Sequence, residues 1–269
     1  MLPVAPKSMT PNSSAKAVLA EAKGWQTIMS RGEERILDVY LDIKSPHSYL
    51  AVRPSLEVAR DYKVQVNFLP YTLSYVGLGL TTSVQPDNKR RPANLTADRK
   101  ARMYYAAARQ YAALQGLPFR SPYRLLDSTS ANKAFLFAKT QKLEVLFLMQ
   151  VYVQGWGSGW RNYEIESLDQ LSETLGLIGA NTEGFEAYMQ SEGLGDTTLR
   201  SCMEKAETSG VTGVPHYVFY DTPLGQQLGL FGREHLALIR EKFAADGLAR
   251  TSSVRPEFSH AWHGPKLTP

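Results

Sequence analysis

Apolar and polar positions alternate along residues 35–43, a segment rich in β-branched and aromatic side chains. This alternation predicts a strand with one buried face. The period then changes, because Ser45 can cap a helix, Pro46 suits its first turn, and apolar positions recur at helical spacing up to about Tyr62. A second apolar strand follows at residues 64–70. A strand, helix and strand of this length predict a parallel pair with a right-handed crossover.

The pattern is different in the middle of the chain. Residues 97–209 show helical periodicity, helix formers such as the three alanines at 106–108, and glycine or proline breaks, with little strand signal. We expect four to six helices there. Strand character returns at residues 217–220 and 226–231, on either side of a turn, and a final helix is expected over residues 233–245.

The order of these elements is that of a thioredoxin fold interrupted by helices, an α/β architecture with a mixed sheet. It divides the chain into an N-terminal extension (1–34), a thioredoxin-like domain (35–75 and 210–246), an inserted all-helical domain (76–209) and a C-terminal tail (247–269). The tail contains proline and serine, and we expect it to be irregular.

Composition excludes several classes of protein. Cys202 is the only cysteine, so no intramolecular disulfide can form and a reducing compartment is favoured. The net charge of +4 suits an anionic ligand but falls short of the basic stripe of a nucleic-acid binder. A membrane span requires about 18 uninterrupted apolar residues, and no stretch of this sequence approaches that length. We therefore expect neither nucleic acid nor membrane as a partner, and a cytoplasmic location with mitochondria or peroxisomes as alternatives.

The turn between the first strand and its helix is where a thioredoxin-type oxidoreductase carries its Cys-x-x-Cys pair. Here residues 45–49 are Ser-Pro-His-Ser-Tyr, so the redox couple is missing. The hydroxyl of Ser45 is left at a helix N-terminus, where unpaired backbone N–H groups favour an anion such as a thiolate. Ligands also bind at the carboxyl ends of strands in α/β sheets. The alternative is that Ser45 only caps the helix.

Two further motifs suit a peptide-like, anionic ligand. In a thioredoxin fold the proline at position 215 is usually cis, which leaves the backbone N–H and C=O of Val214 as an open edge for pairing. A trans proline that begins the strand is the alternative. Gly232 precedes the last helix, where Arg233 and Glu234 stand beside free N–H groups that suit a carboxylate. A solvated helix end is the alternative there.

These motifs together resemble the kappa-class glutathione transferases and the related 2-hydroxychromene-2-carboxylate isomerases. The resemblance depends on the pattern Asp42-x-x-Ser45-Pro46-x-Ser-Tyr-Leu-Ala, on Lys100, on Gly-Val-Pro at 213–215 and on Phe-Gly at 231–232. It covers residues 35–245. It implies a DsbA-like thioredoxin fold, glutathione as the cofactor and a homodimer.

The same resemblance implies roles for individual residues. Ser45 is similar to the serine that stabilises the glutathione thiolate, and Val214 to the residue whose backbone pairs with the cysteinyl unit beside cis Pro215. Lys100 is similar to the ligand of the glycine carboxylate, and Asn88 to the asparagine of the preceding loop.

The chain departs from the family after its last two motifs. His216 follows the proline, and Arg233 and Glu234 follow Gly232, where the family has small polar residues and an aspartate. Arg233 could meet the carboxylate of the γ-glutamyl unit bidentately, and Glu234 could hold its ammonium. His216 could move a proton near neutral pH, and a strand histidine bound to backbone is the alternative.

Aromatic residues around the motifs and in the insertion could line a pocket for an electrophilic substrate, although such stripes are more often helix core. The predicted pocket residues are His47, Tyr49, Tyr104, Trp160 and His216. No metal site is expected, because His260 and His263 have no cysteine or carboxylate cluster nearby.

The favoured hypothesis is a glutathione-dependent isomerase or transferase that acts on an unsaturated or aromatic carbonyl compound through a thiolate held by Ser45. A kappa-type detoxifying transferase is one alternative. The other is a catalytically silent DsbA-like binding or scaffold protein in which Ser45 is only a helix cap.

Overall fold

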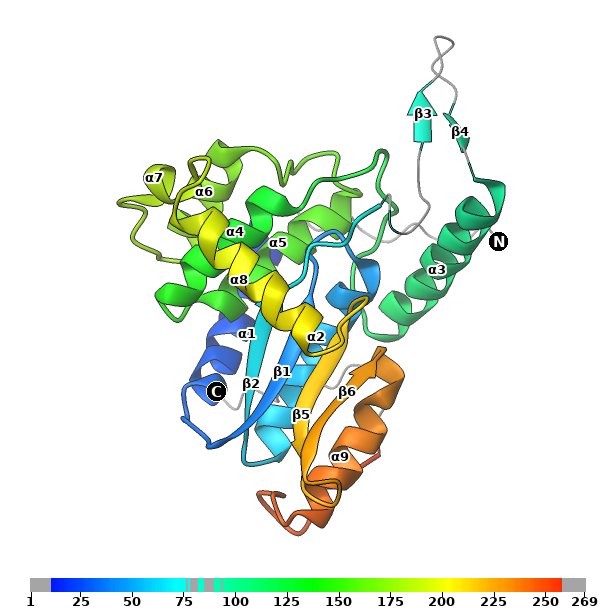
Figure 1. The fold of residues 1–269 in the computed structure, drawn as a ribbon. Coiled ribbons are helices and arrows are strands. Elements are labelled where there is room, and N and C mark those ends of the chain that lie inside the picture. Colours follow the sequence, from blue (N-terminus) through cyan, green and yellow to red (C-terminus); the bar gives the residue numbers. More distant parts are fainter. Residues whose placement is uncertain (1–10, 76, 78–81, 85–89, 93, 258–269) are drawn as a thin grey trace, which may run out of the picture.

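A computed structural model describes residues 11–75, 77, 82–84, 90–92 and 94–257 of the chain. Its centre is a four-stranded sheet in the order β2, β1, β5, β6 (Figure 1). The strands are β1 (Arg35–Leu41), β2 (Val64–Pro70), β5 (His216–Asp221) and β6 (Gln226–Phe231). β1 and β2 are parallel, and β5 runs antiparallel to both β1 and β6. The predicted mixed sheet is confirmed.

Helix α2 (Pro46–Asp61) connects the two parallel strands, as the sequence pattern predicts. Alternation along β1 turns Leu37 and Val39 into the main core, whereas Tyr40 joins a second buried cluster with Ala206 of α8. Helix α8 therefore covers part of the second face of the sheet (Figure 1).

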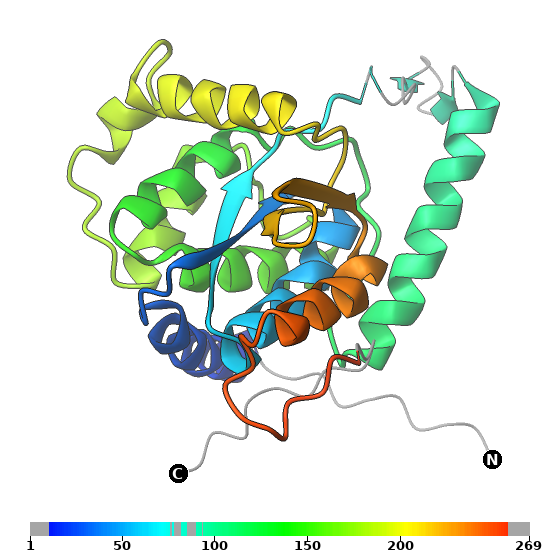
Figure 2. The same ribbon diagram turned by 60° about the horizontal axis from the view of Figure 1, so that its bottom comes forward.

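The insertion contributes six helices to the described part of the chain. They are α3 (Leu95–Leu114), α4 (Thr129–Thr140), α5 (Glu144–Ser158), α6 (Leu168–Leu177), α7 (Phe185–Met189) and α8 (Leu194–Thr208). The insertion also carries a two-stranded sheet, β3 (Thr82–Val84) with β4 (Arg90–Pro92), so it is helical but not entirely so. Strands of three residues are too short to show an alternating pattern, which is why the sequence did not indicate them. Helix α3 stands apart from the other helices of the insertion (Figures 1 and 2).

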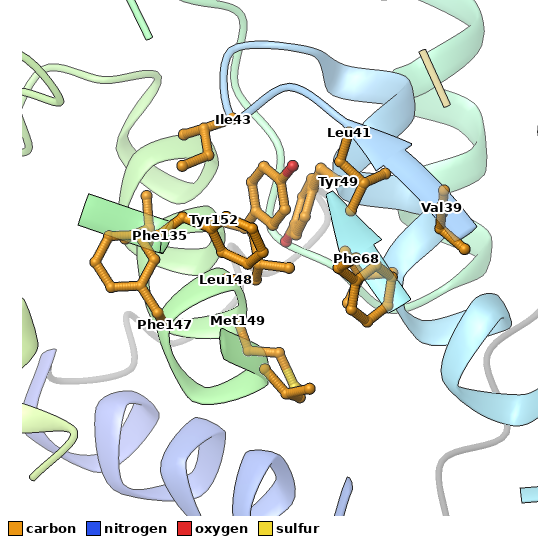
Figure 3. Close-up of a cluster of buried hydrophobic side chains, with 14 of the residues drawn as sticks. Val39, Leu41, Ile43, Tyr49, Phe68, Phe135, Phe147, Leu148, Met149 and Tyr152 are labelled. Atoms are coloured by element: carbon orange, nitrogen blue, oxygen red, sulfur yellow. The ribbon is translucent and has the colours of Figure 1, made fainter. Parts of the chain in front are cut away.

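One continuous core joins the sheet to the insertion. Figure 3 shows Tyr49 of α2 and Tyr152 of α5 side by side, between Phe68 of β2 and a group of apolar side chains from α4 and α5. Their ring centroids are 5.4 Å apart. The thioredoxin-like segments and the inserted helices therefore bury apolar surface against each other, which favours folding as one unit.

Part of the predicted N-terminal extension belongs to this core. Helix α1 (Pro11–Met29) buries Ala22, Trp25 and Met29 there. Arg53 of α2 binds Glu21 of α1 at 2.8 Å.

The last predicted helix is present, with a 3-10 turn, η1 (Arg233–His235), before α9 (Leu236–Ala245). The tail beyond Gly247 is irregular as far as the structure describes it, but it is attached to the domain. Lys63 donates a backbone hydrogen bond to Leu248 at 2.8 Å, and Arg240 donates to the carbonyls of residues 255 and 256.

We predict that Asp61 makes stability depend on pH at this attachment. Its carboxylate accepts hydrogen bonds from Arg60 at 2.7 Å and from Arg240 at 2.8 Å. Burial raises the pKa of Asp61, and these hydrogen bonds outweigh burial and lower it. The pKa of Asp61 is thus lower in the folded protein than in the unfolded chain. Its contribution to stability is complete above the pKa of the unfolded chain, and it is lost as the pH falls through the pKa of the folded protein. Asp61→Asn should cost about 2 kcal/mol at neutral pH and progressively less below about pH 4.

Urea denaturation of the wild type and Asp61→Asn across this pH range would measure the difference. Asp98→Asn is the matched control, because the partner Arg102 is largely exposed and such pairs contribute little. A cost of Asp61→Asn that does not change with pH would contradict the prediction.

Candidate active site

A cavity of about 610 Å³ opens where the carboxyl end of β1 meets the start of α2. We call it the Ser45 cavity. Its other walls come from α3, from the loop before β5 and from the turn between β6 and η1. The lining residues are Lys44, Ser45, Pro46, His47, Leu73, Tyr75, Ala97, Lys100, Ala101, Tyr104, Tyr105, Tyr111, Thr212, Gly213, Val214, Pro215, Phe231, Gly232, Arg233 and Glu234.

Ser45 has both a structural and a chemical position. It is the N-cap of α2, with its Oγ accepting a hydrogen bond from Ser48 N–H at 3.3 Å, and it is 5% exposed on the cavity wall. The hydroxyl accepts this bond through its oxygen, so its hydrogen is still available for donation to a ligand. Ser48 stands where the second cysteine of a redox pair would be, and its Oγ accepts from Asp42 N–H at 3.1 Å. The Ser45 hydroxyl thus lies on the cavity wall, whereas the Ser48 hydroxyl binds the backbone of the turn itself.

The loop before β5 faces the same space. The bond between Val214 and Pro215 is cis, as is usual for this proline in a thioredoxin fold. Pro215 accepts a backbone hydrogen bond from Gly232 at 3.0 Å, which fixes the two loops together. The backbone of Val214 has no hydrogen bond to any other described residue. Its N–H and C=O are available for a ligand.

The turn after β6 brings a buried cation to the cavity. Arg233 is 6% exposed, and its guanidinium lies 4.4 Å from the centroid of the Tyr111 ring on α3. Burial lowers the pKa of Arg233. Gly232 has φ +111°, and a Cβ there would lie 2.4 Å from the carboxylate of Glu234. The turn therefore requires glycine.

Helix α3 supplies the remaining predicted ligand of glutathione. Lys100 is exposed, and its Nζ lies 5.8 Å from the centroid of the Tyr104 ring. Asn88 lies outside the described residues.

Two of the predicted pocket residues, His47 and Tyr104, meet on the cavity wall with ring centroids 5.8 Å apart. Burial and the charge of Arg233 lower the pKa of His47, so its imidazole is neutral at neutral pH. Its buried Nε2 has no hydrogen-bond partner among the described residues.

Tyr49, Trp160 and His216 do not line the Ser45 cavity. Tyr49 stacks on Trp156 and donates to the carbonyl of Pro118 at 3.2 Å, so it is a core residue (Figure 3). Trp160 is fully buried, with its ring centroid 5.4 Å from that of Trp156. Tyr49 and Trp160 are therefore core residues, which was the alternative to a place in the pocket.

His216 follows the lining residue Pro215, but it does not line the cavity itself. It is 6% exposed, and its ring lies over Gly229 of β6, near the end of α8. Burial lowers its pKa, and neither ring nitrogen has a hydrogen-bond partner among the described residues. Successive residues of a strand face opposite sides, so His216 is turned away although Pro215 faces the cavity.

Lys44 and Tyr75 also line the cavity, although the sequence motifs did not indicate them. Lys44 is 5% exposed, with Nζ 3.5 Å from Oδ2 of Asp42 and 4.8 Å from the centroid of the Tyr75 ring. Its position directly before Ser45 was the available signal. The charged lining residues are the cations Lys44, Lys100 and Arg233 and the anion Glu234. The cavity therefore has a positive balance that suits an anionic ligand.

The described part of the chain holds no cluster of three histidine, cysteine or acidic residues that could bind a metal ion. In that same part, none of the helices is both long and apolar enough to span a bilayer.

The fold and this site define a thioredoxin-like protein in which serine stands in place of the redox cysteine. The chain belongs to the DSBA-like thioredoxin domain family, whose sequence model matches residues 36–244. A curated relative, 2-hydroxychromene-2-carboxylate isomerase from Pseudomonas putida, is 28% identical over 159 residues, which are 58% of this chain and 71% of the relative. The resemblance inferred from the motifs is thus confirmed at the level of the family.

Solved structures show the same fold. A 2-hydroxychromene-2-carboxylate isomerase structure aligns with a TM-score of 0.60 at 20% identity, covering 79% of this chain and 96% of that one. The cytosolic disulfide reductase DsbM from Pseudomonas aeruginosa, solved with GSH, aligns with a TM-score of 0.53 at 16% identity, covering 79% and 97%.

Proposed function

We propose that this chain is a glutathione-dependent isomerase or transferase for a small unsaturated or aromatic carbonyl compound. The observation that carries the proposal is the Ser45 hydroxyl, which lies at the N-terminus of α2 in a cavity that also contains cis Pro215 and three cations. The isomerase relative and the reductase solved with GSH support it.

The charges that line the cavity suit those of glutathione. Glutathione is a tripeptide with two carboxylates and one ammonium, and the lining offers three cations and one carboxylate. In this proposal Lys100 binds the glycine carboxylate, the Val214 backbone pairs with the cysteinyl unit, and Arg233 and Glu234 hold the γ-glutamyl end beside Gly232. Asn88 is proposed as a further ligand.

The proposed cofactor supplies a thiolate nucleophile that this chain lacks at the site. The role of Ser45 is to donate its hydrogen to that thiolate, while the dipole of α2 favours the negative charge. Tyr104, Tyr105 and Tyr111 form an aromatic wall that suits a flat substrate. Isomerisation and conjugation differ only in whether the thiol leaves, so the same residues serve either outcome. A homodimer is proposed from the family resemblance.

Calorimetric titration of the purified protein with glutathione tests the proposal. We expect saturable binding to the wild type and about fivefold weaker binding to Lys100→Ala, because an exposed charge pair contributes about 1 kcal/mol. Arg99→Ala is the matched control, since Arg99 is exposed on α3 but does not line the cavity. Absence of binding to the wild type would exclude the glutathione mechanism and leave the fold unaffected.

A further inference from the structure

One cation of the Ser45 cavity has no role in the proposal above. Lys44 is 5% exposed and lines the cavity directly before Ser45. Lysine is almost never buried to this degree without a partner. The position of this buried charge beside Ser45 therefore suggests a role in the cavity.

Two contacts hold the Lys44 ammonium in place. One is the ion pair with Asp42 at 3.5 Å, and the other is the face of the Tyr75 ring at 4.8 Å. Among the residues that the structure describes, Nζ donates no hydrogen bond. Because an ammonium has three donors, the side chain can still donate to a ligand in the cavity.

The acidic partner of Lys44 lies behind the cavity wall. Asp42 is fully buried and is not part of the lining. Its Oδ2 accepts from Leu73 N–H at 2.7 Å, and its Oδ1 accepts from Lys44 N–H at 3.3 Å. The carboxylate charge is thus shared with two backbone donors, and Lys44 is the member of the ion pair that lines the cavity.

The other charged or titratable groups near Lys44 add no second carboxylate to the wall beside it. Burial raises the pKa of Asp127, and hydrogen bonds from Thr129 together with the Lys44 charge outweigh burial and lower it. Asp127 is not part of the lining. Burial raises the pKa of Tyr75, so this phenol is neutral and offers only its ring face. The other titratable side chains of the wall are His47, Lys100, Tyr104, Tyr105, Tyr111, Arg233 and Glu234.

We propose that Lys44 is a second thiolate-stabilising residue, whose ammonium acts together with the Ser45 hydroxyl to keep the thiol of bound glutathione ionised. This inference rests on the proposed function and extends it to a residue that the motifs did not mark. The thiol proton leaves to solvent. A nearby positive charge lowers a thiol pKa because it favours the ionised form.

The test is the pKa of the bound thiol, read from the far-ultraviolet absorbance of the thiolate as pH is raised at saturating glutathione. Lys44→Met should raise this pKa by about one unit, which means about tenfold less thiolate below it. Lys44→Arg retains the charge and should restore most of the effect. Lys100→Met removes an exposed cation of the same cavity and should weaken binding while leaving the thiol pKa nearly unchanged.

A second measurement covers the case in which Lys44→Met folds poorly because Asp42 loses its partner. The double variant Lys44→Met with Asp42→Asn removes both charges. For each protein we would compare the affinities for glutathione and for γ-glutamylserylglycine, which has a hydroxyl in place of the thiol. The unfolded fraction weakens both apparent affinities equally, so it cancels in their ratio.

Above the pKa of the bound thiol, the wild type should prefer glutathione, and loss of Lys44 should reduce this preference about tenfold. If glutathione binds but neither the thiol pKa nor the preference changes on loss of Lys44, the Lys44 inference is wrong and the proposed function stands. If neither peptide binds to the wild type, both are overturned.

Discussion

Gly155→Ala should lower the free energy of unfolding by about 2–3 kcal/mol, the largest stability effect that we predict from a single added methyl group. A Cβ at Gly155 would lie 2.2 Å from Cζ3 of Trp160. The indole of Trp160 is fully buried, with ring centroids 5.4 Å from Trp156 and 6.4 Å from Tyr163, so it has little room to move aside. Urea denaturation followed by tryptophan fluorescence would measure the loss.

The control for this prediction lies two residues further along the same helix. A Cβ at Gly157 would lie 3.6 Å from Cβ of Pro118, which is ordinary van der Waals contact. Gly157→Ala should therefore be neutral or stabilise by up to about 1 kcal/mol, because alanine favours the helix. Equal losses for the two variants would show that the backbone of α5, and not the packing of Trp160, sets the cost.

The fold could be predicted because its signals are local. The alternation of residues 35–43 and the Ser45 cap at the start of α2 each determine a structure within a few residues. The insertion followed from its helical period. The β3–β4 pair was missed because three residues per strand leave no period to detect. The place of α1 in the core was not predicted because its buried face depends on contacts with α2 and α5.

The site was easiest to predict where a motif fixes the backbone. Ser45, Pro215 and Arg233 come from three separate turns, and the structure brings them to one cavity. His216 and Tyr49 are neighbours of these motifs in sequence, but the face that each side chain takes depends on strand alternation and helix packing. Being adjacent in sequence to a site residue does not place a side chain in the site.

Lys44 shows the opposite error. A lysine before a helix cap is usually solvated, and its position before Ser45 places it near the site without indicating burial. It is buried because Tyr75 lies against it and because Leu73 orients the Asp42 carboxylate, and both of these residues follow β2. Contacts between distant segments were therefore needed to recognise it.

Ser45→Ala should reduce glutathione-dependent turnover of the test electrophile chlorodinitrobenzene about 10- to 100-fold at neutral pH. The variant removes the hydroxyl hydrogen that we propose is donated to the thiolate, and one charge-assisted hydrogen bond is worth about 1.5–3 kcal/mol. The same substitution removes the cap of α2, whose loss costs about 1 kcal/mol of stability. Rate and stability therefore have to be measured on the same preparations.

Ser167→Ala separates these two effects. Ser167 caps α6 in the same way, with its Oγ accepting from Gln170 N–H at 3.4 Å, and it does not line the Ser45 cavity. Both variants should lose similar stability in urea denaturation, and only Ser45→Ala should lose turnover. If the two variants lose turnover equally, Ser45 acts only as a helix cap, and the proposed role of its hydroxyl toward the thiolate is wrong.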